Sequence, residues 1–402
     1  MIMVTGVNMT MISKGIVLGW HRDFECPGGD CGLTCCHKDW QIRLKDDEIE
    51  YYRNLDHEYR DKIIESIDAD KKVFKCDNGK CNLLTDEGYC NIVLNCGADK
   101  LCNTCKTFPR ISKSFGDIME CGVEIVCPLV AENLFDEKEI DFDFCDFEVS
   151  QIEPIDYNIY DSLAKMRASV VSMMQLELGT RELLPGKMYI MLNMYQQVLD
   201  LYKKSELSPA SVSEILDKFC SQDKMVQYFL ECSKLGDLID EKISVITNIL
   251  LNTIKTGIMA ELCTQWSEAY PKLKESIETW MNNPEIFRND IVEFMDYMRN
   301  NYPYFTEKYF AYIWFMDGVS LKPEEYERKI CSRTMEHLLI NIAAMSVYKN
   351  GGCSISKKEF AVVVAAIDRY ISHARRVQND LMDMFNELKA ASMINLLLMI
   401  IC

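Results

Sequence analysis

Cysteine is concentrated in the first part of this chain. Thirteen of the 19 cysteines lie between Cys26 and Cys145, and the other six are scattered over the remaining residues. The same region is rich in glycine, so the elements expected there are short and joined by loops. A loop-rich fold buries little apolar surface, and metal–thiolate bonds can supply the missing cross-links. The cysteine pattern therefore predicts a metal-stapled region near the start of the chain.

These cysteines are expected to be reduced thiols. Residues 1–20 contain one lysine, Lys14, and no compact apolar stretch followed by a small-residue cleavage site, so no secretory signal peptide is predicted. We therefore expect a cytoplasmic protein, in which disulfides are rare. In a reducing compartment such a local concentration of cysteine indicates metal binding. The six scattered cysteines are better explained as small buried hydrophobic residues.

The chain is acidic, because 44 lysine and arginine residues face 62 aspartate and glutamate residues, for a formal net charge of −18. Such a charge repels nucleic-acid backbones and anionic membrane surfaces, and it attracts cationic partners such as a protein that presents lysines. A contribution to solubility alone is the other explanation. The most apolar segment, 393–402, is too short to cross a bilayer, so no membrane span is predicted.

The residue pattern predicts a mostly α protein with two parts. Residues 1–150 are expected to form a loop-rich, cysteine-rich domain that binds a metal or an iron–sulfur cluster, and residues 151–402 an all-α helical bundle. In the first part, one helix is expected over 46–68. The acidic stretch 136–161 alternates charged and aromatic residues without a helical period, which favours an extended segment.

Helix-start signals recur in the second part. They share a capping residue ahead of a proline or a glutamate: Ser208-Pro209, Asn283-Pro284, and Ser356 with Glu359 after the Gly351-Gly352 break. Behind the second signal, apolar residues follow the i, i+3, i+4, i+7 spacing of a buried helix face: Ile291, Phe294, Met295 and Met298.

The clustered cysteines form spaced groups, namely Cys26, Cys31 and Cys35-Cys36, then Cys76, Cys81, Cys90 and Cys96, then Cys102 and Cys105, with Cys121, Cys127 and Cys145 behind them. Thiolates prefer zinc, copper(I) and iron–sulfur clusters. A structural zinc site usually has paired CxxC knuckles, and only Cys102 and Cys105 form one. A single zinc ion would leave most thiols unexplained. An iron–sulfur cluster, expected as the 4Fe–4S type, fits the number better, with zinc as the alternative.

The spacing of the first group disfavours radical chemistry with S-adenosylmethionine. That chemistry requires CxxxCxxC, whereas Cys31 is followed by Cys35-Cys36 and by no third cysteine at the required offset.

Three blocks of the chain are similar to a known family. The first runs from Phe24 through the double cysteine to Trp40, the second from Cys81 to Cys90, and the third from Leu101 through Phe108-Pro109-Arg110 and Glu120 to Cys127-Pro128. Together they resemble the flagellin lysine N-methylase family. The wider group of CxxxCC zinc- or iron-chelating proteins shares parts of the arrangement.

The resemblance implies methyl transfer from S-adenosylmethionine to lysine side chains of flagellin, assisted by an iron–sulfur cluster. It also implies eight metal ligands: Cys26, Cys31, Cys35, Cys36, Cys81, Cys90, Cys105 and Cys127. No GxGxxG follows a predicted strand, so a Rossmann-type cofactor domain is not supported. The cofactor then binds in another way, for example with its amine and carboxylate on an iron of the cluster.

Other interpretations stay open. The chain can be a non-catalytic zinc- or iron-binding or redox-sensing protein, or an enzyme that methylates another protein or peptide. Arg110 can pair with a cofactor carboxylate or hydrogen-bond loop carbonyls. His37 beside the double cysteine can be a ligand or a solvated residue, and His337 and His373 fall in helical segments. The residue pattern identifies no catalytic base.

Overall fold

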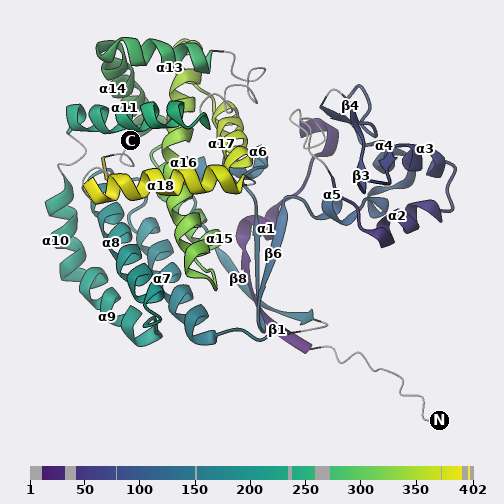
Figure 1. Cartoon of the computed structure of the whole chain (residues 1–402), viewed down its shortest axis with the longest axis horizontal. Coiled ribbons are helices and arrows are strands. Elements are labelled where there is room, and N and C mark those ends of the chain that lie inside the picture. Colours follow the sequence, from purple (N-terminus) through teal and green to yellow (C-terminus); the bar gives the residue numbers. More distant parts are fainter. Residues whose placement is uncertain are drawn as a thin grey trace.

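The computed structural model describes residues 11–31, 42–77, 79–149, 152–233, 238–258, 272–372, 374–391 and 397–398. Its largest part is a body of helices, with a sheet along one side and a smaller lobe beyond the sheet (Figure 1). The predicted mostly α fold with a helical second part is confirmed. Among the described residues, no helix is both long and apolar enough to cross a membrane.

The helical body contains α7 (Tyr157–Gln175), α8 (Leu184–Lys203), α9 (Pro209–Cys220), α10 (Gln222–Cys232), α11 (Ile239–Lys255), α13 (Leu273–Asn282), α14 (Pro284–Asn301), α15 (Phe305–Asp317), α16 (Pro323–Asn350), α17 (Lys357–Ser372) and α18 (Arg375–Ala391). Apart from Met316, every residue of α15 is buried. A helix that is apolar on all sides belongs inside a fold, and α15 lies within the body with α16 beside it (Figure 1).

The predicted helix starts are confirmed. Ser208 caps α9 by accepting a hydrogen bond from the backbone N–H of Ser211, with proline at the first helical position. Pro284 opens α14, and the apolar residues that follow it at helical spacing are buried. Ser356 and Glu359 form the expected side-chain and backbone bonds before α17. The bonds to backbone N–H groups satisfy donors that the first turn of a helix leaves unpaired.

A four-stranded sheet, which the residue pattern did not predict, covers one side of the body. Its strands are β1 (Met11–Leu18), β6 (Arg110–Phe115), β7 (Ile118–Val123) and β8 (Phe142–Val149), in the order β6-β7-β1-β8. β6 and β7 form an antiparallel hairpin, β1 runs parallel to β7, and β8 runs antiparallel to β1. Part of the acidic stretch is therefore extended, as β8.

The main hydrophobic core joins this sheet to the helices. Leu18 and Val123 from the strands and Leu338 from α16 belong to one buried cluster. The short α1 (Gly19–Asp23), η1 (Gly28–Cys31), α6 (Pro128–Ala131) and η3 (Glu132–Phe135) lie in the segments around the sheet. The core therefore crosses residue 150, where the residue pattern placed a domain boundary, because the sheet and the helices bury each other's apolar faces.

The segment 42–108, called the cysteine lobe from here on, has a separate small core. It contains α2 (Asp46–Arg53), α3 (Arg60–Glu65), α4 (Asn91–Cys96), η2 (Ala98–Lys100), α5 (Asn103–Thr107), and the hairpins of β2 (Ile67–Asp68) with β3 (Val73–Phe74) and of β4 (Cys76–Asp77) with β5 (Lys80–Cys81). Figure 1 shows the lobe set apart from the helical body, on the far side of the sheet.

The single helix predicted over 46–68 is wrong, because the structure divides it into α2 and α3. Between them, the Nδ1 of His57 accepts a hydrogen bond from the backbone N–H of Tyr59, which replaces a helical bond. The break lets Leu55 and Ile63 both point into the small core, and burial of two large side chains outweighs one continuous helix.

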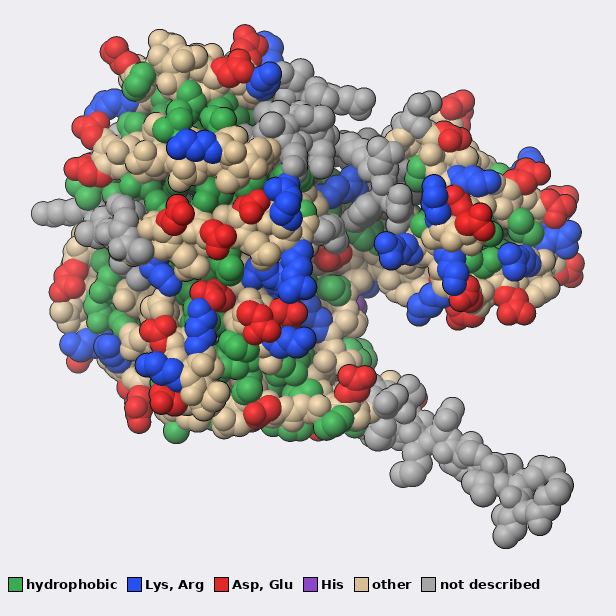
Figure 2. All heavy atoms as spheres, in the orientation of Figure 1, with side chains coloured by type: hydrophobic (Ala, Val, Ile, Leu, Met, Phe, Trp, Pro, Cys, Tyr) green, Lys and Arg blue, Asp and Glu red, His purple; other side chains and the backbone are tan. Residues whose placement is uncertain are grey.

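On the face drawn in Figure 2, acidic and basic side chains are interspersed over both the helical body and the cysteine lobe. The excess of acidic residues therefore does not form one patch on that face.

Candidate functional site

Six cysteines belong to the cysteine lobe, and five of them lie in or against its small core. Cys76 of β4 is paired directly opposite Cys81 of β5. Cys90 occupies the N-cap position of α4, and Cys102 occupies that of α5, one turn before Cys105. Cys102 is buried in the core, and Cys81, Cys90 and Cys105 pack against it. Hairpin pairing and two helix starts thus direct thiols from separate segments toward one core.

The pKa values of two thiols differ in direction. Burial raises the pKa of Cys81 to about 11, and the neighbouring Cys76, Cys90 and Cys102 thiols add to the rise. A hydrogen bond with the Cys105 side chain lowers the pKa of Cys102 below its usual value. Metal ligation requires the thiolate. Cys102 is therefore predisposed to act as a ligand, whereas Cys81 ionises only beside a compensating cation.

A sixth thiol, Cys96 at the end of α4, lies 3.4 Å from the Nδ1 of His57. Imidazole nitrogen and thiolate sulfur are both common ligands of zinc and of iron. The lobe therefore supplies the types of donor atom that a thiolate metal centre requires. Within the described ranges, no three His, Cys, Asp or Glu side chains are gathered closely enough to hold a metal ion as they stand.

The eight predicted ligands do not all fall in this lobe. Cys81, Cys90 and Cys105 lie in it. Cys26 is exposed, and its sulfur lies 3.4 Å from the backbone N of Gly28. Cys31 ends η1 and is half-buried. Cys127, the N-cap residue of α6, is buried in the main core beneath the sheet. Cys35 and Cys36 lie outside the described residues.

Arg110, predicted either to pair with a cofactor carboxylate or to hydrogen-bond loop carbonyls, makes contacts of the second kind in this structure. Its guanidinium donates to the backbone carbonyls of His21 and Phe24 and lies over the Phe24 ring. It thereby fixes the chain leading into Cys26 against the start of β6. His337 is buried against Phe305, and burial lowers its pKa to about 3, so it is a neutral packed residue. His37 and His373 lie outside the described residues.

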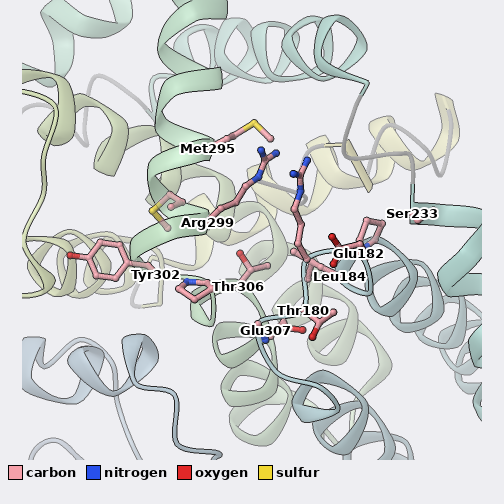
Figure 3. Close-up of a pocket in the computed structure, with 14 residues that line it drawn as sticks. Thr180, Glu182, Leu184, Ser233, Met295, Arg299, Tyr302, Thr306 and Glu307 are labelled. Atoms are coloured by element: carbon pink, nitrogen blue, oxygen red, sulfur yellow. Dashed lines mark hydrogen bonds between the residues drawn. The ribbon is translucent and has the colours of Figure 1, made fainter.

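The residue pattern missed several buried polar groups of the helical body. The first is an ion pair between Lys187 of α8 and Glu307 of α15, both at most 2% exposed. The Oε2 of Glu307 also accepts the backbone N–H of Gly179 at 2.6 Å. These bonds fix the turn between α7 and α8 against the start of α15, where a pocket opens (Figure 3).

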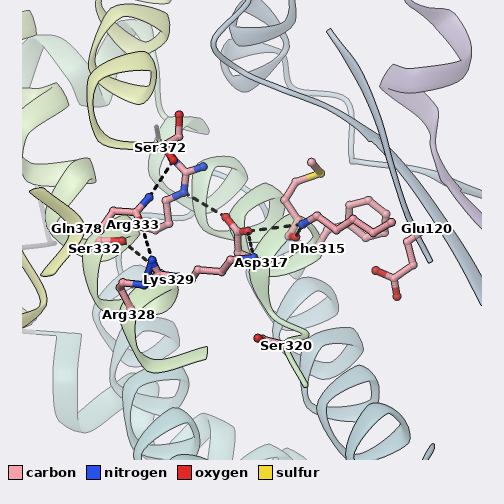
Figure 4. A network of polar contacts seen from close by, with 12 residues as sticks. Glu120, Phe315, Asp317, Ser320, Arg328, Lys329, Ser332, Arg333, Ser372 and Gln378 are labelled. Atoms are coloured by element: carbon pink, nitrogen blue, oxygen red, sulfur yellow. Dashed lines mark hydrogen bonds and ion pairs between the residues drawn. The ribbon is translucent and has the colours of Figure 1, made fainter. Parts of the chain in front are cut away.

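A second group surrounds Arg333 of α16 (Figure 4). Its guanidinium donates to Asp317 at 3.1 Å, to Glu336 at 2.6 Å and to Asp368 of α17. Burial raises the pKa of Glu336 to about 8. Burial also raises the pKa of Glu124, at the end of β7, to about 7, and Asp368 contributes to that rise. Carboxyl groups of this kind are candidates for holding protons near neutral pH.

A third group anchors the sheet. Arg167 of α7 forms two 2.7 Å hydrogen bonds with the carboxylate of Glu120 on β7, and the Tyr160 hydroxyl donates to the same carboxylate at 2.7 Å. Bidentate pairing of this kind is both strong and directional. Glu120 therefore has a structural role between sheet and helices.

One signal in the residue pattern points to these groups. Arg333, Glu336 and His337 are spaced i, i+3, i+4, so they share the face of α16 that also carries buried apolar residues. Lys187 directly precedes Met188 in a helix that is buried on most sides. A charged residue at a position that the helical period assigns to the core indicates a buried partner, but not which residue it is.

The amino-acid sequence matches the model of a known protein family. The model of the FliB lysine N-methylase C-terminal domain matches residues 181–399, more than half of the chain. This match covers the helical body from α8 onward, including the Lys187 and Arg333 groups, and it begins well after the cysteine lobe. No solved structure matches.

Similar curated proteins point the same way. Two are lysine-N-methylases, of Salmonella typhimurium and Salmonella choleraesuis, each 22% identical over 251 residues that make up 59% of this chain and 53% of the relative. Another is the flagellar biosynthetic protein FliU of Salmonella muenchen, 24% identical over 129 residues, or 29% of this chain and 73% of the relative. The chain thus spans about half the length of the two lysine-N-methylases. With the family model matched over most of its helical body, the chain belongs to the FliB lysine N-methylase family.

Proposed function

We propose that this chain transfers methyl groups from S-adenosylmethionine to lysine side chains of flagellin, with an iron–sulfur cluster held by its cysteines. The observation that carries the proposal is the family match over residues 181–399. The names of the similar proteins, lysine-N-methylase and a flagellar biosynthetic protein, support the reaction and the substrate.

The reaction sets two requirements. The lysine nitrogen forms a bond to the methyl carbon while the bond from carbon to the sulfonium sulfur breaks, so the electron pair returns to sulfur and S-adenosylhomocysteine leaves. A lysine ammonium has a pKa of roughly 10.4 and no free electron pair, so its proton must first pass to a base or to water. The rest is alignment of nitrogen, carbon and sulfur in one line.

The acidic character of the chain suits a lysine-bearing partner. The formal net charge is −18, and such a field raises the encounter rate with cationic surfaces. Burial raises the pKa of Glu124 to about 7, so near neutral pH part of it is carboxylate. Glu124 is therefore a candidate for accepting a proton, because its pKa lies close to the pH at which a base must work. Glu336 is fully buried against Arg333 and is not such a candidate.

The cysteine lobe supports the metal part of the proposal. Cys81, Cys90 and Cys105 would hold the metal, with Cys76 and Cys102 beside them. A bound iron–sulfur cluster would cross-link the lobe and provide an iron of Lewis-acid character. Zinc is the alternative, since it accepts the same thiolate donors.

The test is anaerobic incubation of the metal-loaded protein with S-adenosylmethionine and purified flagellin, read by intact mass. We expect flagellin to gain whole methyl increments, and the modified residues to be lysines when the protein is digested and sequenced by mass. Flagellin of unchanged mass, with folded and metal-loaded enzyme, contradicts the proposal.

Matched cysteine variants extend this test. Cys105→Ser removes a thiol packed against the small core, whereas Cys353→Ser removes an exposed thiol far along the chain, in the turn after α16. We expect the first variant to lose metal and activity and the second to keep both. Equal metal content in the two variants would show that the lobe does not hold the metal.

A further inference from the structure

A pocket of about 230 Å³ opens between helices of the body (Figure 3). Four segments line it: the turn 179–182 with the start of α8, Ser233 at the end of α10, the C-terminal half of α14, and the start of α15 with the two residues of its approach that line the pocket. All but two of its lining residues, Gly179 and Thr180, fall within the family match at 181–399. The pocket thus belongs to the part of the chain that defines the family.

The walls of this pocket are fixed by buried contacts. Glu307 forms part of its floor and holds both Lys187 and the backbone N–H of Gly179. Gly179 has a φ of +80°, and a Cβ there would lie 2.7 Å from the Tyr304 ring. Only glycine fits that turn. The residues that follow Gly179 are therefore held in place before any ligand arrives, which reduces the cost of binding.

Charges of both signs line the pocket. Arg181 comes from the turn and Arg299 from α14, which supplies two guanidinium groups from different elements. The Nη1 of Arg299 also pairs with Asp296, one turn earlier on the same helix, at 2.7 Å. Glu182 supplies a carboxylate on the turn side of the pocket (Figure 3). The carboxylate of Glu307 is already taken up by Lys187 and Gly179, so Glu182 is the acidic group that faces a ligand.

Between these charges the lining combines apolar and polar side chains. The apolar ones are Leu184, Pro185, Met295, Met298 and Pro303, and the polar ones are Thr180, Ser233 and Thr306. An unbranched side chain with a sulfur atom packs well against such a surface. The lining does not suit a polyanion, because of its carboxylate, nor a lysine side chain alone, because two arginines repel an ammonium group.

We infer that this pocket binds the zwitterionic methionyl end of S-adenosylmethionine. The cofactor carboxylate pairs with Arg181 and Arg299, its ammonium pairs with Glu182, and its carbon chain lies on the methionine and proline surface. Arginine suits the carboxylate because its donors match both oxygens. The volume accommodates the amino-acid part and leaves the nucleoside to extend toward solvent, since sites for whole drug-sized ligands are about 300 Å³ or larger.

This inference rests on the proposed function for the identity of the cofactor, and it places that cofactor in the helical body rather than on a metal of the cysteine lobe. The nearest alternative is chelation of the same amine and carboxylate by iron. The two differ in which residues the affinity depends on.

The test is calorimetric titration of S-adenosylmethionine into the full chain and its variants. We expect Arg299→Gln and Arg181→Gln each to weaken binding at least tenfold, which is a typical value for one lost charge-assisted pair. Arg288→Gln is the matched control, because Arg288 lies on the same helix and pairs with Asp240 as Arg299 pairs with Asp296, but it does not line the pocket. It should bind like the parent protein.

Thermal unfolding of each variant shows whether a loss of affinity reflects a loss of fold. Free methionine should compete with the cofactor in the parent protein and compete less well in Arg299→Gln. Unchanged affinity in both pocket variants overturns the inference. If those variants also methylate flagellin normally, the proposed function stands without this pocket. If the parent binds the cofactor through the arginines but methylates no lysine, the pocket stands and the proposed function fails.

Discussion

The cysteine lobe and the helical body bury different kinds of side chain. The lobe has a small core built from residues such as Tyr52, Ile63 and Phe74, with cysteines around it. The body has a far larger apolar core and buries ion pairs within it, such as Lys187 with Glu307. A small core supplies little net stability and needs cross-links. A large one can tolerate the cost of desolvated charges that fix the positions of its helices.

The two regions therefore differ in what stabilises them. In the lobe, thiols surround a small core, and the proposed metal would cross-link them. In the body, packing is complete and pairs of charges position loops and helix ends around a pocket. The family match also lies on the body. The stabilising groups of each region thus match the ligand that we propose for it, a metal in the lobe and a cofactor in the body.

The strongest test of this contrast is the buried pair in the body. Lys187→Met leaves the Glu307 carboxylate at the pocket floor without its cation, and we expect the free energy of unfolding to fall by about 3–5 kcal/mol. Urea unfolding followed by circular dichroism measures the change. The double variant Lys187→Met with Glu307→Leu should recover much of the loss, because no isolated charge remains.

The matched control is an exposed pair in the same body. Lys274 lies 3.8 Å from Glu278, both largely exposed on α13, and Lys274→Met should change the stability by less than about 0.5 kcal/mol. Equal effects of the two lysine variants would mean that the body does not depend on its buried charges.

In the lobe, the largest effect is expected from apolar packing. Ile63 is fully buried, so Ile63→Ala should destabilise the lobe by about 3 kcal/mol through lost contacts and a cavity. Its neighbour Ile64 is only half-buried, and Ile64→Ala should cost less than half as much. Hydrogen–deuterium exchange read by mass spectrometry locates the loss.

We expect faster exchange over 42–108 and unchanged exchange in α15 and α16. The two regions have separate cores, and separate cores open separately. Equally fast hydrogen exchange in the body would contradict the distinction between the two regions, because it would mean that the lobe and the body unfold as one cooperative unit.

A smaller effect depends on pH. Glu124 has a pKa of about 7 in the folded protein, against about 4.5 when exposed. At pH values between these two, Glu124 keeps its proton in the native protein, whereas the same group releases it in the unfolded chain. The contribution of this proton to the stability of the native state is therefore complete below pH 4.5 and is lost as the pH rises through 7. The shift corresponds to about 3 kcal/mol, which partial exposure reduces to roughly 2.

Glu124→Gln should remove this dependence, so its stability should decline less than that of the parent between pH 5 and pH 7.5. Glu214→Gln, at an exposed position of α9, should leave the dependence as it is. Chemical unfolding at a series of pH values gives the comparison. Identical slopes for the parent and Glu124→Gln would show that Glu124 does not hold a proton in the native protein.

The smallest effect compares two helix starts of the body. Ser208 caps α9 with its hydroxyl, whereas Ser221 at the start of α10 forms no side-chain cap bond. Ser208→Ala should cost about 1 kcal/mol, and Ser221→Ala close to nothing. A similar cost for both would mean that the cap bond contributes little. Thermal unfolding resolves a difference of this size.

The residue pattern predicts some of this fold for physical reasons that are local. Ser208-Pro209 and the pairing of Ser356 with Glu359 involve residues within one helical turn, so their structure follows from adjacent residues. The sheet is different, because β1 pairs with strands more than 100 residues away. Nothing in residues 11–18 alone indicates that β1 pairs with β7 and β8. The strands of this sheet are also short.

The same limit applies to the candidate sites. The cysteine spacing indicated a metal region, and the structure draws Cys81, Cys90 and Cys105 around one small core. The charged pocket was not predicted, since Arg181 and Arg299 are separated by more than 100 residues and each is an ordinary surface-compatible arginine in its own segment. Only the folded chain, which brings the turn 179–182 beside α14 and the start of α15, shows that they share a cavity.

The measurement that tests the division between lobe and body most directly is S-adenosylmethionine binding to the full chain before and after removal of its metal. The protein is titrated with the cofactor when metal-loaded, and again after anaerobic treatment with a chelator, with circular dichroism as a check on the helices. The account predicts dissociation constants within about threefold of each other, because the pocket of α8, α14 and α15 contains no cysteine. Loss of binding on metal removal, with the helices intact, would contradict it and place the cofactor on the metal of the cysteine lobe.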